Sequence, residues 1–148
     1  MKVKVTTLVF FVLLAGCASK VFQHPLLVAN SSEPSVAIYF FREDVFWNSG
    51  VAQPVHVNGE ALLQLRRATY AKVSLRPGTY QVEARPIGAA QSVNPWITCG
   101  GPMGFELGKT YFVLLRFQGG DGVMCFSPVL ITEEGARSLM ATYSAIHQ

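Results

Sequence analysis

The clearest fold signal in the chain lies at residues 53–65, which read QPVHVNGEALLQL. Two runs of mostly apolar residues flank the dipeptide Asn58-Gly59. Asn followed by Gly supplies the two positive-φ positions of a type I′ turn, which joins two antiparallel strands with the correct twist. The stretch therefore predicts a β-hairpin with strands at Gln53–Val57 and Glu60–Leu65.

The same pattern of short strands and turns continues on both sides of this hairpin. Further strands are expected at Val36–Arg42, Thr69–Leu75, 79–87, 110–118 and 123–131. Turn signals that recur about every 8–12 residues are typical of an antiparallel β-sandwich, and the sequence predicts a mainly β fold of this kind. Residues 88–104 are expected to form a loop, because they include glycines at 100, 101 and 104 and prolines at 95 and 102.

The C-terminal segment has a different periodicity. Thr132 can cap a helix, and Glu133 and Glu134 suit the positive end of its dipole. Apolar residues then recur at helical spacing, at Ala136, Leu139, Met140, Tyr143 and Ile146. This stripe predicts a short C-terminal α-helix packed on the sandwich.

The N-terminus has the features of a bacterial export signal. Lys2 and Lys4 precede an uncharged run at 5–14, which is shorter than the roughly 20 residues of a membrane-spanning helix. The run ends in Leu-Ala-Gly-Cys at 14–17, which resembles the lipobox of bacterial lipoproteins at every position. The resemblance implies that residues 1–16 are removed and that Cys17 carries a diacylglycerol. The alternative is an ordinary cleaved signal followed by a chance cysteine.

The lipobox also suggests a location and a domain organisation. Several acyl chains on one residue make a stable membrane anchor. Ala18 follows the lipid-bearing cysteine, whereas Asp at that position retains enterobacterial lipoproteins in the inner membrane. We therefore expect an outer-membrane protein that faces the periplasm, with a lipidated tether at 17–35 and a β-sandwich domain at 36–148. The apolar residues at 26–28 indicate that part of the tether lies on the domain or near the bilayer.

Composition and charge exclude several classes of protein. Half of the residues are hydrophobic and 14% are charged, which is too apolar for a disordered chain. The net charge is +3, and two of the positive residues, Lys2 and Lys4, lie in the segment that is expected to be removed. Such a small charge gives no support to nucleic-acid binding, so membrane lipid and an envelope protein are the expected partners.

Two further cysteines and three histidines are the candidate reactive groups. With Cys17 used for lipid, Cys99 and Cys125 form an even pair in an oxidising compartment, which predicts a disulfide. Two free buried thiols, or a metal-binding or catalytic thiol, are the alternatives. The histidines lack metal-ligand spacing, and neither a nucleophile elbow nor a phosphate-binding loop is present in the sequence. We therefore expect a non-enzymatic protein without metal or cofactor.

Two expected loops carry large apolar side chains where polar ones are usual. Phe46 and Trp47 lie between the first two strands of the domain, and Trp96 and Ile97 lie in the 88–104 segment. Apolar residues in loops either cap the core or form an adhesive surface. Because loops of a sandwich cluster at its ends, these four residues are the candidate binding surface.

A wider resemblance covers residues 35–146. Val36–Arg42, the V-x-V-N-G hairpin at 55–59, LRPGTYQV at 75–82 and GKTYF at 108–112 follow one another as in a family of short bacterial lipoproteins of unknown function. The hairpins also resemble those of PEGA modules. The resemblance implies an Ig/PEGA-like β-sandwich and brings no catalytic residues. The expected function is binding of an envelope protein or wall component, with carriage of a small apolar ligand or lipid as the alternative.

Overall fold

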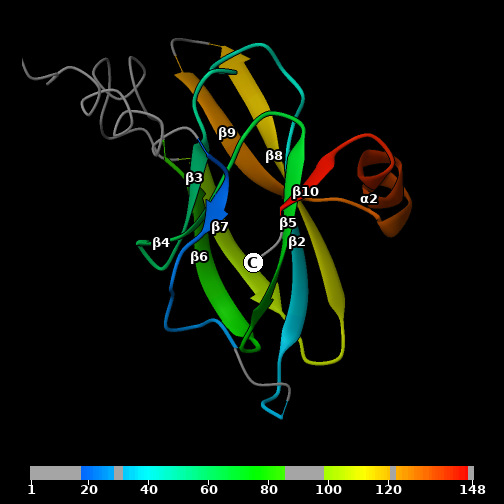
Figure 1. Ribbon diagram of the computed structural model, residues 1–148. Helices are drawn as coiled ribbons and strands as arrows, with labels where there is room; N and C mark the ends of the chain where they lie inside the picture. The colour runs from blue at the N-terminus through cyan, green and yellow to red at the C-terminus, as the bar shows by residue number, and fades with distance from the viewer. Residues whose placement is uncertain (1–17, 29–31, 86–98, 121–122, 147–148) are drawn as a thin grey trace, which may run out of the picture.

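The computed structural model describes residues 18–28, 32–85, 99–120 and 123–146, which form two five-stranded sheets and one short helix (Figure 1). The first sheet has the order β1-β4-β3-β6-β7. Its strands are β1 (Lys20–Val21), β4 (Glu60–Leu65), β3 (Gln53–Val57), β6 (Gly78–Ala84) and β7 (Cys99–Phe105). The second sheet has the order β10-β5-β2-β8-β9. Its strands are β10 (Ser144–Ile146), β5 (Thr69–Leu75), β2 (Val36–Arg42), β8 (Thr110–Gly120) and β9 (Val123–Leu130). The predicted mainly β fold is confirmed.

The two sheets share one hydrophobic core. Its fully buried members come from both sheets and include Ile38, Phe40, Val55, Leu62, Leu63, Val73, Val82, Val113 and Leu115. The expectation of a wholly antiparallel arrangement is wrong for the second sheet, where β2 pairs in parallel with β8, and β10 in parallel with β5. The chain passes through the first sheet between β2 and β8, and parallel neighbours need such a crossover connection.

The hairpin at 53–65 has the predicted geometry. Asn58 and Gly59 have φ angles of 50° and 85°, the two positive values that a type I′ turn requires. Val57 pairs with Glu60 across the turn. The Asn58 side-chain oxygen also accepts a hydrogen bond from the N–H of Gln81 at 3.0 Å. The turn thus fixes the β3–β4 register and also contacts β6.

The prediction of a loop over 88–104 is wrong for its last part, because Cys99–Phe105 forms the strand β7. The first part of that loop, 88–98, lies outside the described residues. Pro102 is tolerated because β7 is an edge strand and needs a hydrogen-bonded neighbour on one side only. Gly100 is required by close packing, since a Cβ there would lie 2.0 Å from the carbonyl oxygen of Val82 in β6. The glycines and the proline of this segment are therefore compatible with a strand at the edge of the sheet.

The C-terminal helix is confirmed but is shorter than its apolar stripe. It is α2 (Glu133–Met140), and Thr132 caps it by accepting the N–H of Gly135 at 3.2 Å. Ala136 packs against Phe41 and Leu114, so α2 covers the outer face of the second sheet. Tyr143 and Ile146 lie beyond the helix, contrary to the prediction. After α2 the backbone N–H of Ser144 bonds the carbonyl of Ala68, and the chain pairs with the edge of β5 as β10.

The predicted disulfide between Cys99 and Cys125 is confirmed. It joins β7, at the edge of the first sheet, to β9, at the edge of the second. The two Cα atoms are 6.1 Å apart. The bond therefore links an edge strand of one sheet to an edge strand of the other.

The other side of the sandwich is crossed by the N-terminal segment. Lys20 and Val21 pair with β4 in the first sheet, and the N–H of Phe22 bonds the carbonyl of Leu62 at 2.9 Å. Further on, the N–H of Val28 bonds the carbonyl of Ser74 in β5 of the second sheet, also at 2.9 Å. Residues 20–28 therefore lie on the domain and connect the edges of both sheets.

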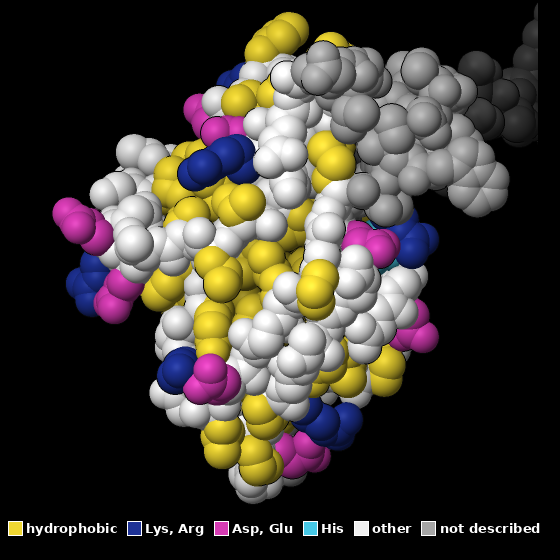
Figure 2. All heavy atoms as spheres, turned by 180° about the vertical axis from the view of Figure 1, so that it is seen from behind, with side chains coloured by type: hydrophobic (Ala, Val, Ile, Leu, Met, Phe, Trp, Pro, Cys, Tyr) yellow, Lys and Arg dark blue, Asp and Glu magenta, His cyan; other side chains and the backbone are white. Residues whose placement is uncertain are grey.

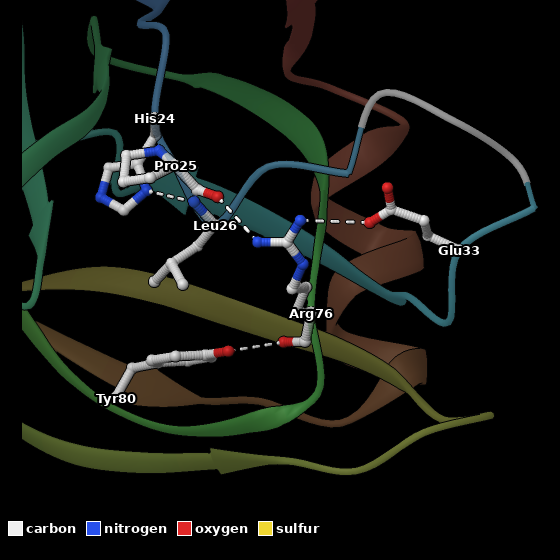
Figure 3. Close-up of polar contacts among 6 residues, drawn as sticks. All are labelled: His24, Pro25, Leu26, Glu33, Arg76 and Tyr80. Atoms are coloured by element: carbon white, nitrogen blue, oxygen red, sulfur yellow. Dashed lines mark hydrogen bonds and ion pairs between the residues drawn. The ribbon is translucent and has the colours of Figure 1, made fainter.

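His24 and Arg76 hold this segment in place (Figure 3). His24 is buried, its Nδ1 accepts the N–H of Leu26 at 3.2 Å, and its Nε2 lies 3.3 Å from the carbonyl oxygen of Val57. The Arg76 guanidinium donates to the carbonyl of Pro25 at 3.1 Å and to the Glu33 carboxylate at 3.2 Å. These contacts fasten the segment to the β3–β4 hairpin and to the end of β5.

His24→Ala is expected to release the segment while the sheets stay folded. The change leaves a cavity and removes the contact with the Val57 carbonyl, and it costs about 2 kcal/mol of unfolding free energy. Hydrogen exchange should show lost protection at the Phe22 and Val28 amides. Gln23→Ala, at an exposed neighbouring position, is the matched control. Unchanged protection in the His24 variant would contradict the anchoring role.

Candidate functional site

The candidate site lies where several connections meet at one end of the sandwich. Figure 1 shows the loop 43–52 between β2 and β3, the connection between β4 and β5, and the end of β8 at this end of the molecule. The described chain also begins here, since the carbonyl of Ala18 accepts the Gln64 side-chain amide at 2.6 Å. We call this region, formed by residues 18–19, 43–52 and 66–69, the Trp47 end.

Arg42, the last residue of β2, organises the Trp47 end from within. It is fully buried. Its guanidinium donates to the carbonyl of Val51, to that of Leu65 at 3.0 Å and to that of Asn48 at 2.7 Å. The guanidinium carbon lies 4.8 Å from the centre of the Phe126 ring. Among the described residues, backbone carbonyls and an aromatic face take the place of a carboxylate partner.

The surroundings of Arg42 disfavour its charge without removing it. Burial, and then the nearby charges of Arg66 and Arg67, lower the pKa of Arg42 to about 10. At neutral pH the guanidinium therefore stays protonated and keeps its donors. The cost of burying the charge is offset by the carbonyl groups that it draws together from the loop and from the end of β4.

The loop 43–52 is held on its outer side as well. A carboxylate oxygen of Glu43 accepts the N–H of Phe117 at 2.7 Å. The N–H of Asp44 donates to the Tyr143 hydroxyl at 3.0 Å, and the Asp44 carboxylate lies 2.9 Å from the Arg67 guanidinium. With Arg42 beneath it, the loop is attached to β8, to the β4–β5 connection and to the residues after α2. Its conformation is therefore set before any partner binds.

The two aromatic residues of this loop differ in how far they are exposed to solvent. Phe46 is 86% exposed, whereas Trp47 is 40% exposed and lies with its ring 5.8 Å from that of Phe117. Phe46 thus does not cap the core, and Trp47 partly covers a neighbouring ring. Trp96 and Ile97, the other half of the predicted surface, lie outside the described residues.

An open, polar pocket lies directly beside the loop. It has a volume of about 490 Å³ and is lined by Ser49, Gly50, Arg66, Arg67 and Thr69. The sequence shows Arg66 and Arg67 as a small basic patch near Tyr70, but the Tyr70 ring stacks on Phe41, a residue of the cluster beneath α2. Ser49 and Gly50 were missed, because only the folded chain brings the loop next to the β4–β5 connection.

A second hollow lies along the N-terminal segment. This groove has a volume of about 350 Å³ and is lined by Ser19, Lys20, Val21, Phe22, Gln23, Leu27 and Ile146. Most of these side chains are apolar. The groove lies between β1 and β10, which belong to different sheets.

Apolar exposure is not confined to the Trp47 end. Leu107, Met124 and Leu130 are also large and exposed. Seen from behind (Figure 2), hydrophobic side chains form a band down the middle of the molecule, with most charged side chains towards its rim. The combination of a rigid loop, an exposed aromatic ring and a basic pocket is what distinguishes the Trp47 end.

Comparisons with protein-family models, curated proteins and solved structures found no match. Within the described ranges, no three His, Cys, Asp or Glu side chains lie close enough together to hold a metal ion. The helix that the structure describes is too short to cross a membrane.

Proposed function

We propose that this protein is a lipid-anchored, non-enzymatic component of the bacterial cell envelope, held on the periplasmic face of the outer membrane by acylated Cys17. The Trp47 end is its binding surface for another envelope protein or a wall component. The observation that carries the binding role is the fixed loop that leaves Phe46 86% exposed. The lipobox residues at 14–17 support the anchor.

The energetics of binding favour such a loop. Association costs less when the contact residues are already ordered, and Arg42 and Glu43 order this loop through their contacts with backbone groups. Large aromatic side chains supply much of the binding energy at protein interfaces. An exposed Phe46 beside a partly covered Trp47 is the kind of contact that a partner pocket can bury.

The finer fold assignment is part of the same proposal. The hairpin at 53–65, together with two sheets around one core, supports an Ig/PEGA-like β-sandwich of the kind expected for short bacterial lipoproteins. The second expected hairpin, at 75–82, is wrong, because β5 and β6 belong to different sheets and the turn between them crosses from one sheet to the other. In such modules the sheets act as a rigid support, and the connections at their ends carry the contacts.

The groove between β1 and β10 favours the alternative function, carriage of a small apolar ligand or lipid. Its volume of about 350 Å³ falls at the lower end of the size of small-molecule sites. It is lined by Val21, Phe22, Leu27 and Ile146 among others. A single acyl chain has the shape and polarity to lie in it.

Photo-crosslinking in cells tests the proposed function. A photoreactive residue at position 47 of the mature lipoprotein should give a discrete protein adduct, whereas the same residue at the exposed position 138 on α2 should not. Position 96, on the other predicted loop, is the next site to probe. Adducts to lipid alone would favour the alternative function. Absence of any adduct at 47 and 96 would contradict both.

A further inference from the structure

The chain leaves the sandwich immediately next to the residue that is expected to carry the lipid. The carbonyl of Ala18 accepts the Gln64 amide at 2.6 Å, and the Ser19 hydroxyl accepts the N–H of Arg66 at 2.7 Å. The Ser19 hydroxyl also lies 3.4 Å from that of Thr69. Consecutive Cα atoms are about 3.8 Å apart, so Cys17 is within one residue of the folded surface. A lipid on Cys17 would therefore be attached one residue before the part of the chain that contacts β4.

The surface at this exit point is basic. Lys20 follows directly on Ser19, and Arg66 and Arg67 line the pocket of about 490 Å³ beside it. Arg67 is paired with Asp44, but both side chains are about half exposed, at 46% and 54%, so the pair is open to solvent. Arg66 has no ion pair with any described residue. The Glu43 carboxylate nearby accepts the N–H of Phe117.

The pocket itself contributes donors and no carboxylate. Its lining consists of the two arginines, the hydroxyl residues Ser49 and Thr69, and Gly50. The Thr69 hydroxyl donates to the carbonyl of Arg66 at 2.8 Å, which leaves the guanidinium groups and Ser49 to face a ligand. A guanidinium presents paired N–H donors that match the oxygens of a phosphate. The chemistry of the pocket therefore suits a phosphate group.

We propose that this pocket binds the phosphate groups of lipid headgroups in the membrane that carries the anchor. The proposal rests on the lipid anchor of the proposed function, because acylation of Cys17 would hold the pocket at the height of the headgroups. The domain then lies directly on the bilayer with its Trp47 end towards the membrane. A partner of Phe46 and Trp47 is accordingly one that lies at the membrane surface.

Vesicle flotation of the unlipidated mature chain tests the site without the anchor. The chain from residue 17, with Cys17→Ser, is mixed at low salt with vesicles of phosphatidylglycerol or of phosphatidylcholine. Binding to the anionic vesicles is expected, and it should fall as salt is added. Each basic residue near an anionic bilayer strengthens binding about fivefold, so Arg66→Gln with Arg67→Gln should weaken it about thirtyfold.

A control variant separates the site from net charge. Lys109→Gln with Arg137→Gln removes the same charge from two exposed residues, one before β8 at the opposite end of the sandwich and one on α2, and binding should stay nearly unchanged. An equal loss in both double variants would overturn the proposal, as would failure of the parent chain to bind anionic vesicles. Binding of inorganic phosphate without binding of vesicles would show a site for a free anion and would also overturn it.

The outcome is independent of whether Cys17 is acylated, because the tested chain has serine there. The mass of the N-terminal peptide from the cellular protein reports acylation separately. An unmodified Cys17 with positive flotation would refute the anchor and leave the phosphate site standing. An acylated Cys17 with no binding in flotation would support the anchor and refute the phosphate site.

Discussion

Arg42→Met is expected to lower the free energy of unfolding by about 3 kcal/mol, because it removes every donor that joins the 43–52 loop to the end of β4. The carbonyls of Asn48 and Val51 can turn towards water once the loop moves, whereas the hydrogen bond to Leu65 is buried. Removing the buried charge returns part of its desolvation cost, since methionine has a similar shape and no charge. The net loss is therefore smaller than the sum of three charge-assisted hydrogen bonds.

The loop should respond more strongly than the sheets. Urea unfolding measures the global change, and hydrogen exchange at the Ser49 and Val51 amides, which bond Phe46 and Asn48 within the loop, measures the local one. Arg116→Met is the matched control, since Arg116 is exposed and its replacement should change stability by less than about 0.5 kcal/mol. An Arg42 variant with wild-type stability and an intact loop would show that the carbonyl contacts contribute nothing to either.

The turns were the part of the fold that could be predicted from sequence. Asn58-Gly59 can adopt the two positive φ angles of a type I′ turn, and it indicated the β3–β4 hairpin correctly. The cap at Thr132 likewise marked the start of α2. Such signals depend on a few neighbouring residues, so they can be recognised without knowledge of the tertiary structure.

Elements that depend on distant neighbours were missed. β7 forms because Gly100 allows its backbone to lie against β6, and β10 forms because β5 offers an unpaired edge. In both cases the local sequence favours another structure, a loop or a longer helix. Pairing with a strand that is remote in sequence decides the outcome, and no pattern within the segment records it.

The candidate site was predicted only in part for the same reason. Phe46 and Trp47 stand out in the sequence as apolar residues in a loop. Arg42 does not, because a charged residue after an apolar run usually marks the solvent-exposed end of a strand. Its burial results from the packing of Phe126 and from carbonyls of two separate segments. The pocket likewise needs the loop and the β4–β5 connection to be adjacent.

The second large effect is expected from loss of the disulfide. Replacing Cys99 and Cys125 by alanine should lower the free energy of unfolding by about 3.5 kcal/mol, the chain-entropy value for a bond between cysteines 26 residues apart. The melting temperature should fall by about 10–15 °C for a domain of this size. The loss should be concentrated at β7, which contains three glycines and which, among the strands that the structure describes, pairs with β6 alone. Without the bond to β9, the backbone connection at 106–109 is the covalent link between β7 and the second sheet.

Reduction of the wild-type protein provides the matched control, because it opens the same bond without altering a side chain. Reduced wild type and the double alanine variant should unfold at nearly the same urea concentration, well below that of the oxidised protein. Hydrogen exchange should show the largest loss of protection at the β7 amides. Protection should change little at β2, the central strand of the second sheet, and at its neighbour β5. A reduced protein that unfolds at the oxidised midpoint would mean that β6 and the core alone hold β7, and that the bond closes a loop already ordered in the unfolded chain.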